Sequence, residues 1–445
     1  MKLIETLKNI WKIEDLRKRL ITTFLFILIY RFGCHVVLPG INPGDLEAMR
    51  KFTSGGLMQL LDMFSGGAFG QASIFALGIM PYITASIVIQ LMGMVVPSFQ
   101  KMQREGESGR MKLNQYTRYL TVAILLVQAP AYLMNLEYQV KAAGGQAHIS
   151  FGMMVFLTIV LTAGAMMIMW LGEKMTDKGI GNGISIIILV GILARFPGAI
   201  VQEFTNRLNT AQGGLVMFLV EIVLLFAVTA GAVMLTQGTR KVPVQYAKRI
   251  VGNKQYGGAR QYIPLKVNAA NVMPIIFAQA IMFIPITLAG FGQHQDASGF
   301  SGWISRNLGD MNGLWYNVIY FIMIVLFTYF YTAITVRPTQ MAEEMKKNSG
   351  FIPGVKPGKK TAEYLDSIMS RITLPGSLFL GIVAILPAFA RLFGVNQQFA
   401  QFFGGTSLLI TVGVVLDTLQ QIETHLMMHH YDGLMKSGKI KGRNR

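Results

Sequence analysis

The sequence predicts an all-α membrane protein that crosses the bilayer ten times. Of its 445 residues, 52% are hydrophobic and only 14% are charged, whereas about 25% are charged in ordinary soluble domains. Its long apolar runs contain at most one charged residue each, and about 20 helical residues suffice to cross the hydrocarbon core. Because backbone polar groups must be paired within lipid, such runs cross as helices. The ten-residue alternation of a membrane β-barrel is absent.

The chain begins with an expected amphipathic helix at 1–19. Apolar side chains recur there at helical spacing, and basic side chains occupy much of the opposite face, a pattern typical of a helix on the inner surface of the membrane. The apolar set is Leu3, Leu7, Ile10, Trp11 and Leu16. A helix of this kind most often serves as an anchor.

Ten expected spans cover 20–38, 74–96, 119–136, 153–172, 183–200, 215–236, 272–291, 314–336, 372–390 and 404–422. On one side of them, six segments hold 32 of the 40 Lys and Arg residues: 1–19, 97–118, 173–182, 237–271, 337–371 and 423–445. The other eight include Arg31 and Arg195, near the outer ends of spans. Since Lys and Arg accumulate on the cytoplasmic side, both termini are expected in the cytoplasm.

The first outer loop, 35–73, contains an unusual stretch. Residues 55–70 (GGLMQLLDMFSGGAFG) are glycine-rich and moderately apolar, yet too short and too interrupted to span. One interpretation is a re-entrant segment, which is tolerated at membrane depth only inside protein or against a water-filled cavity. The other is an outer loop with a short interfacial helix.

Two cytoplasmic loops differ from the rest in length and charge. The loop 237–271 carries seven basic residues and no acidic one, interleaved with tyrosines, and the loop 337–371 carries seven basic and four acidic residues. Such surfaces favour an RNA or an acidic protein as partner. They could instead only enforce topology and contact lipid head groups.

The templates for nucleotide and metal sites do not fit. The string GVKPGK at 354–359 has one residue too few for a phosphate loop, and Lys360 stands where Ser or Thr should bind magnesium. The string GIGNG at 179–183 lacks the third glycine and the preceding strand of a dinucleotide site. His425 and His429 share a helix face but have no evident further metal ligands. No enzyme activity and no cofactor are expected.

Ionisable residues inside spans are the usual sign of coupled transport, because burying a charge there is costly. Only Glu221 and Asp417 qualify, which favours a passive path. Four spans also place isoleucines close to glycine, proline or small hydroxylic residues, in the strings GIMPYITAS, GIGNGISIII, MPIIFAQ and GGTSLLITVG. These isoleucines are either packing stripes or an apolar constriction that blocks ions by dewetting.

Several long strings resemble the SecY family, the large subunit of the bacterial protein-translocation channel. They are DMFSGGAFGQASIFALGIMPYITASI at 62–87, EGESGRMKLNQYTRY at 105–119, MWLGEKMTDKGIGNGISIII at 169–188, VQYAKR at 244–249, PLKVN at 264–268 and FFGGTSLLI at 402–410. The resemblance covers essentially the whole chain, with the strings in the family's order.

The resemblance implies a central pore between two pseudo-symmetric halves of five helices, 20–200 and 201–422, followed by a cytoplasmic tail at 423–445. It implies a pore ring of Ile79, Ile83, Ile184, Ile188, Ile276 and Ile410. It also implies a plug at about 57–70, which includes Leu57, Leu60, Leu61, Met63, Phe64, Ser65, Gly66 and Gly67. Spans two and seven would form a lateral gate with Gln90 and Gln279.

The resemblance further implies transport of unfolded secretory polypeptides across the inner membrane and lateral release of transmembrane segments into lipid. The implied partners are the small subunits SecE and SecG, the motor ATPase SecA, the ribosome, signal sequences, nascent chains and membrane lipids. Candidate docking residues are Lys248, Arg249, Lys254 and Lys356, the last in a turn where the family typically has arginine. The alternatives are a secondary transporter of a small solute and a membrane scaffold that only docks ribosomes.

Overall fold

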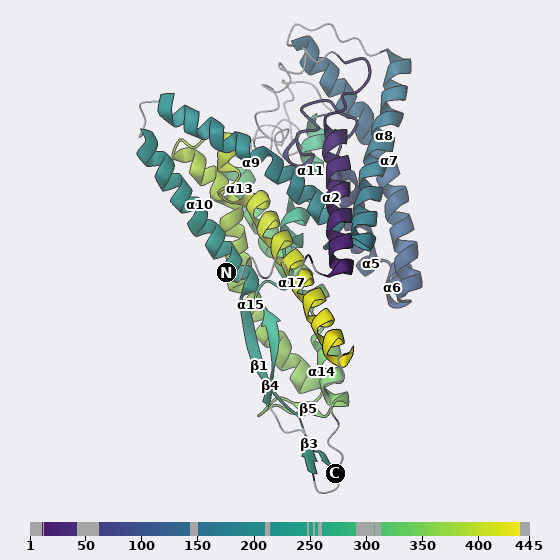
Figure 1. Cartoon of the computed structure of the whole chain (residues 1–445), viewed down its shortest axis with the longest axis vertical. Coiled ribbons are helices and arrows are strands. Elements are labelled where there is room, and N and C mark those ends of the chain that lie inside the picture. The colour runs from purple at the N-terminus through teal and green to yellow at the C-terminus, as the bar shows by residue number, and fades with distance from the viewer. Residues whose placement is uncertain are drawn as a thin grey trace. The chain divides into compact units, whose positions relative to one another are not determined.

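A computed structural model describes residues 11, 13–41, 62–142, 150–209, 214–246, 249–251, 254–256, 260–290, 307 and 313–436. Helices dominate these residues (Figure 1). The chain forms two compact units, one of residues 1–202 with 414–445 and one of residues 203–413.

Seven helical segments among the described residues are long and apolar enough to cross a membrane. They are α7 (Glu107–Ala142), α8 (Phe151–Lys178), α9 (Gly183–Asn209), α10 (Gly214–Gln237), α13 (Leu314–Thr335) with α14 (Pro338–Lys347), α15 (Lys359–Leu392) and α17 (Gly405–Lys436). Each covers one expected span. Several extend well beyond it, so that much of the expected loop 97–118 is helical.

The other three expected spans contain shorter helices, α2 (Glu14–Cys34), α5 (Met80–Val95) and α11 (Met273–Gly290). The expected start of the second span at residue 74 is wrong, because 74–79 form turns and the helix begins only at Met80. Gly78 has a φ of +56°, which helices do not allow, and Pro81 in the first turn favours a helix start. After α5 the chain bends by 104° into α6 (Pro97–Arg104). The count of ten crossings stays a prediction.

Helix α2 crosses the expected boundary between a surface helix at 1–19 and a span from residue 20. Helix α2 runs without a break from Glu14. Ion pairs one helical turn apart, from Lys18 to Glu14 at 2.9 Å and from Arg19 to Asp15 at 3.3 Å, support its first turns. Leu16 is buried, so this part of the helix packs against protein.

To the expected helical fold, the second unit adds a small antiparallel sheet that the sequence did not predict. Strand β1 (Thr239–Tyr246) lies between β4 (Arg260–Lys266) and β5 (Gly350–Phe351), and β2 (Arg249–Val251) pairs with β3 (Lys254–Tyr256). Val242 and Val244 alternate with exposed residues and enter a buried cluster with residues of α14 and α15. Figure 1 shows β1 and β4 as a long pair near α14. The two basic loops therefore form one folded body, here called the basic module (237–271 and 337–371).

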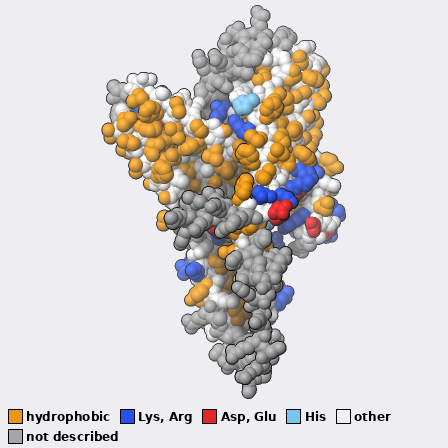
Figure 2. All heavy atoms as spheres, viewed as in Figure 1, with side chains coloured by type: hydrophobic (Ala, Val, Ile, Leu, Met, Phe, Trp, Pro, Cys, Tyr) orange, Lys and Arg blue, Asp and Glu red, His pale blue; other side chains and the backbone are white. Residues whose placement is uncertain are grey.

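The helices expose apolar side chains on a scale that soluble proteins avoid. In α10 only 11% of the most apolar stretch is buried within the protein. Val216, Val223, Phe226 and Met234 are among its exposed residues. On the face seen in Figure 2, hydrophobic side chains cover much of the helices, and Lys and Arg gather at the end of the first unit where α6 lies. Both features fit helices surrounded by lipid.

Candidate functional site: a buried segment held by polar contacts

Residues 62–70, here called the 62–70 segment, form one short helical turn followed by irregular backbone, and all nine are buried. Local hydrogen bonds fix its shape. The Gly67 amide donates to the Asp62 carbonyl at 2.7 Å, and the Ser65 hydroxyl accepts from the Phe69 amide at 3.0 Å. Gly66 and Gly67 both have positive φ angles, which glycine adopts without strain. This enclosed irregular backbone favours the re-entrant interpretation over the exposed outer loop.

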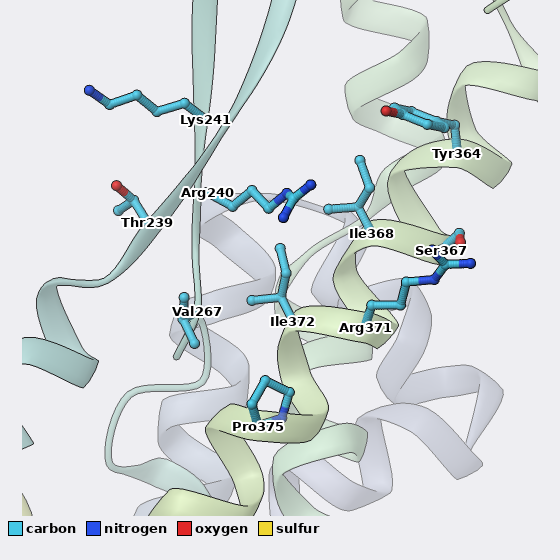
Figure 3. Close-up of a pocket in the computed structure, with 10 residues that line it drawn as sticks. All are labelled: Thr239, Arg240, Lys241, Val267, Tyr364, Ser367, Ile368, Arg371, Ile372 and Pro375. Atoms are coloured by element: carbon cyan, nitrogen blue, oxygen red, sulfur yellow. The ribbon is translucent and has the colours of Figure 1, made fainter.

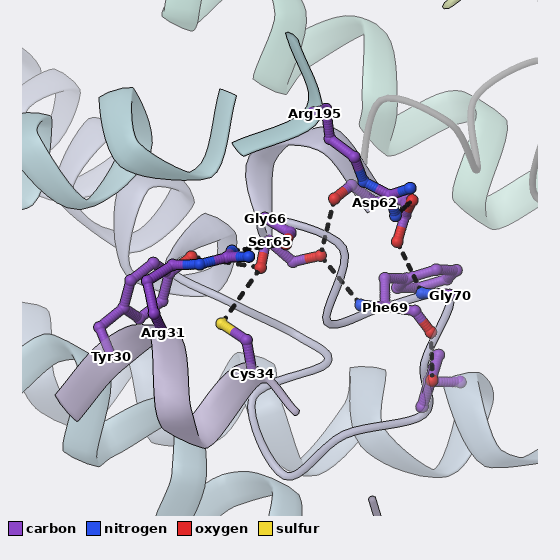
Figure 4. A network of polar contacts seen from close by, with 10 residues as sticks. Tyr30, Arg31, Cys34, Asp62, Ser65, Gly66, Phe69, Gly70 and Arg195 are labelled. Carbon is purple, nitrogen blue, oxygen red and sulfur yellow. Dashed lines mark hydrogen bonds and ion pairs between the residues drawn. The ribbon is translucent and has the colours of Figure 1, made fainter. Parts of the chain in front are cut away.

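Helix α2 contacts the middle of the 62–70 segment through three neighbouring side chains (Figure 4). Arg31 Nη1 donates to the Gly66 carbonyl at 2.8 Å, and the Tyr30 hydroxyl donates to the Ser65 carbonyl at 3.2 Å. The Cys34 thiol also points to the Ser65 carbonyl, with its sulfur 3.7 Å from the oxygen. The contacts satisfy buried backbone carbonyls outside the helices and strands, of which the Ser65 carbonyl also accepts from the Ala68 amide at 3.4 Å.

Two further contacts hold the ends of the 62–70 segment. Asp62 forms an ion pair with Arg195 of α9, and its Oδ1 accepts from the Gly70 amide at 2.7 Å (Figure 4). The Tyr132 hydroxyl of α7 donates to the Phe69 carbonyl at 2.8 Å, and the two rings pack with centroids 4.8 Å apart. Three helices of the first unit therefore hold the segment.

The expected plug overlaps the 62–70 segment. Met63, Phe64, Ser65, Gly66 and Gly67 lie in it, whereas Leu57, Leu60 and Leu61 lie outside the described residues. Sequence reasoning missed the residues that hold it, namely Tyr30, Arg31, Cys34, Tyr132 and Arg195. The one available signal was the position of Arg31 and Arg195 near the outer ends of apolar spans, where a charged side chain needs a partner.

The six expected ring isoleucines all lie near the starts of helices. Ile79 and Ile83 are one helical turn apart at the start of α5, as are Ile184 and Ile188 at the start of α9. In the second unit, Ile276 and Ile410 follow the starts of α11 and α17. Four are buried, and Ile184 and Ile276 are half-buried. Their joining into one ring stays a prediction.

The two expected gate glutamines differ in their surroundings. Gln90 of α5 is half-buried, and its amide nitrogen lies 3.4 Å from the Ser86 hydroxyl on the same helix. Gln279 of α11 is 5% exposed, and its Oε1 has no hydrogen-bond partner among the described atoms. An unpaired buried amide oxygen costs stability, which distinguishes Gln279 from the half-buried Gln90.

A buried charge cluster contains Glu221, a residue whose role could not be predicted from the sequence. Arg207 of α9 donates to Glu203 Oε1 at 2.9 Å and to Glu221 Oε1 of α10 at 2.5 Å, and all three side chains are at most 6% exposed. The other Glu203 oxygen accepts from the Asn396 amide at 2.9 Å. The cluster joins α9, α10 and the loop before α16 (Gln397–Ala400).

The docking candidates all belong to the basic module. Arg249 and Lys254 lie in β2 and β3, Lys248 lies outside the described residues, and Lys356 is exposed. The turn that presents Lys356 has glycines of positive φ on both sides, Gly354 at +86° and Gly358 at +98°. The basic character of the module is therefore displayed on strands and a tight turn.

A cavity of about 910 Å³ in the second unit lies between β1 and α15. Its ten lining residues include three basic side chains, Arg240, Lys241 and Arg371, and no acidic one. In Figure 3, Arg240 points toward α15, whereas Lys241 and Thr239 point to the other side of the strand. The cations do not converge on one point, so the cavity resembles an open basic groove more than a site for a small anion.

Comparisons with known proteins agree on one family. The sequence model of the SecY family matches residues 73–419. A protein translocase subunit SecY of Streptomyces galbus is 43% identical over 435 residues, which cover 96% of this chain and 98% of that protein. A protein of the same name from Mycobacterium bovis is 41% identical over 444 residues, covering 95% and 97%.

Solved structures agree in fold. One, whose plug domain is described as stabilising the closed state of the SecY translocation channel and maintaining a membrane seal, has a TM-score of 0.63 at 19% identity. Another, Sec61 in a canine ribosome–channel complex, has a TM-score of 0.58 at 18% identity. Each alignment covers 92% of both chains.

Proposed function

Because this chain belongs to the SecY family, we propose that it is the channel subunit of a protein translocase. It passes unfolded polypeptides across the membrane and releases apolar segments sideways into lipid. The observation that carries this proposal is the match to translocase subunits along nearly their whole length, at about two identical residues in five. These relatives are translocase subunits and not solute transporters, which disfavours the secondary-transporter alternative.

Within this function the 62–70 segment is the plug. A plug must be stable at rest and must also leave without unfolding the channel wall. Hydrogen bonds to its carbonyls and one ion pair meet both needs, because each can be exchanged for contacts with water once the segment moves.

The six isoleucines form an apolar ring that seals by dewetting and yields around a passing chain. Helices α5 and α11 form the lateral gate, with Gln90 and Gln279 on its faces.

The location of the chain, its orientation and its partners follow from the family and from the distribution of Lys and Arg along the sequence. The chain lies in the cell membrane with both termini in the cytoplasm, as the excess of Lys and Arg in alternate segments indicates. It performs no covalent chemistry, so the energy comes from partners, which are the motor ATPase SecA for secreted chains and the ribosome for inserted ones. The small subunits SecE and SecG complete the channel.

A reconstitution tests the function. The purified chain and its small subunits are placed in liposomes with SecA, ATP and an unfolded secretory precursor. The precursor is expected to become resistant to added protease only when ATP is present, because it has entered the vesicle. A scaffold that only docks ribosomes leaves the precursor fully digestible, and that result would contradict the proposal.

Docking of the ribosome to the basic module is expected to be electrostatic. Reversal of Lys248 and Arg249 to glutamate removes two cations from a strongly basic loop and adds two anions. Ribosome binding is expected to weaken at low salt, and the salt dependence of the binding constant is expected to become shallower. Co-sedimentation with ribosomes over a series of salt concentrations measures both.

The matched control reverses Arg110 and Lys112, which are exposed basic residues in the first turns of α7 and outside the basic module. It makes the same change in net charge, so it should leave ribosome binding close to that of the unaltered chain. An equal loss in both variants would show that only overall charge matters and would remove Lys248 and Arg249 from the docking site.

A further inference from the structure

One face of α9 carries both ring isoleucines and the contacts to the plug. Ile184, Ile188, Gly191 and Arg195 follow each other at intervals of four, three and four residues, which places them on a single face of the helix. Ile188 is buried, and so is the 62–70 segment that Gly191 and Arg195 touch. A rotation or outward shift of α9 moves all four residues together.

Gly191 lets the backbone of the 62–70 segment lie directly against α9. A β-carbon added at Gly191 would lie 3.1 Å from the Phe64 carbonyl oxygen, 3.2 Å from the Gly66 amide nitrogen and 3.3 Å from the Met63 carbonyl oxygen. All three are backbone atoms, so they can give way only if the segment itself shifts. The close approach of the two backbones therefore favours glycine at this position.

Arg195 lies one helical turn further along the same face and pairs with Asp62. The Asp62 side chain is only 11% exposed, and its other oxygen is held by the Gly70 amide. The guanidinium also lies over Gly67, where an added β-carbon would come within 2.9 Å of Arg195 Nη2. Arg195 thus fixes the start of the segment at Asp62, as Figure 4 shows, and it also lies against Gly67.

We propose that Arg195 is a latch that couples the plug to the pore ring through α9. The latch rests on the proposed function, since it assigns the ring and the plug their roles there. When a translocating chain pushes Ile188 outward, α9 carries Gly191 and Arg195 with it. The Asp62–Arg195 ion pair then separates and the backbone contact at Gly191 opens. Widening of the ring and release of the plug become one motion, so the plug needs no separate trigger. Arg195 is a positioning residue, because it acts through Asp62.

The chain contains its own reporter for this motion. Cys34 is the single cysteine, and its buried sulfur lies beneath the Ser65 carbonyl of the plug. Because the Ser65 carbonyl lies against the thiol, movement of the 62–70 segment away from α2 is expected to expose the thiol to a maleimide, and the labelling rate then reports this movement without any activity assay. The measurement uses the full chain with its small subunits in detergent.

Replacing Arg195 by glutamine, or Asp62 by asparagine, is expected to raise the labelling rate of Cys34 at least about tenfold, since a hydrogen bond to a charged group is lost. Arg195→Lys keeps the charge and should restore most of the protection. The control Arg118→Gln breaks an ion pair with Glu173 that does not involve the segment and should leave the rate unchanged. Unchanged labelling in Arg195→Gln, or equal acceleration in the control, would overturn the latch.

Coupling to the ring is tested by a double-mutant cycle. Ile188→Phe crowds the ring and is expected to accelerate labelling of Cys34 in the otherwise unaltered chain. In the Arg195→Gln background, the same substitution should increase the labelling rate of Cys34 by a much smaller factor, because the latch is already open. Independent, multiplicative effects would show that ring and plug are uncoupled. The labelling experiment does not depend on translocation, so its outcome is separate from that of the liposome experiment. If the chain shows the coupled labelling rates but does not translocate the precursor in liposomes, the channel function is refuted and the latch is not.

Discussion

Replacement of Ile83 and Ile188 by glycine is expected to raise the resting ion conductance of the reconstituted channel at least about tenfold, which corresponds to about 1.4 kcal/mol off the barrier to ion passage. Both isoleucines are buried near the starts of α5 and α9. Loss of two branched side chains widens an apolar constriction and lets water enter it, and a wetted constriction no longer excludes ions. Single-channel recording in planar bilayers measures the effect.

The matched control replaces Ile168 of α8 by glycine. Ile168 is completely buried but lies outside the expected ring, so its loss costs stability without opening the pore. The resting ion conductance of the Ile168→Gly variant should equal that of the unaltered channel. Similar conductance in both variants would show that any large cavity causes leakage, and the ring assignment would be wrong.

Replacement of Arg207 by glutamine is expected to lower the free energy of unfolding by about 3–5 kcal/mol, the range for removing one partner of a buried ion pair. The substitution leaves Glu203 and Glu221 close together with no guanidinium between them, and each is at most 2% exposed. It also loosens the loop at Asn396, which Glu203 holds. Unfolding by SDS in mixed micelles measures the change.

Arg118→Gln again supplies the comparison, because the Arg118–Glu173 pair is 47% and 23% exposed. Exposed pairs contribute about 0–1 kcal/mol, so the control should unfold almost like the unaltered chain. If Arg207→Gln lowers the free energy of unfolding no more than the control does, the cluster is solvated and does not stabilise α9, α10 and the loop before α16.

The helices were predictable because their signal is local. Hydropathy depends on neighbouring residues, so seven of the ten expected spans coincide with long helices. Helix ends were less predictable, since Gly78 and Pro81 displaced the start of α5 although both residues are apolar or neutral. The sheet was missed for a different reason. Its strands are short, and β1 pairs with β5 about a hundred residues later, which no local pattern encodes.

The contacts around the 62–70 segment show the same limit. The resemblance predicts a plug at this place in the chain, but the partners of the segment come from far along the chain. Asp62 pairs with Arg195, which is 133 residues away, and Phe69 with Tyr132, which is 63 residues away. A lone charged residue in a span indicates that a partner exists but does not identify it. Glu221 illustrates this, because its partner Arg207 lies beyond the end of the preceding expected span.

The pairing of β1 with both β4 and β5 has a mechanical consequence. Strand β1 follows α10 directly, β4 leads within a few residues into α11, and the chain after β5 enters α15. In the proposed function, a motor or ribosome bound to the basic module therefore holds a folded body that is connected to three helices at once. Tension on that body reaches α11, which bears Ile276 and Gln279, through only six intervening residues. In the proposed function, force generated in the cytoplasm is thus delivered to the helix that carries one proposed ring residue and one proposed gate residue.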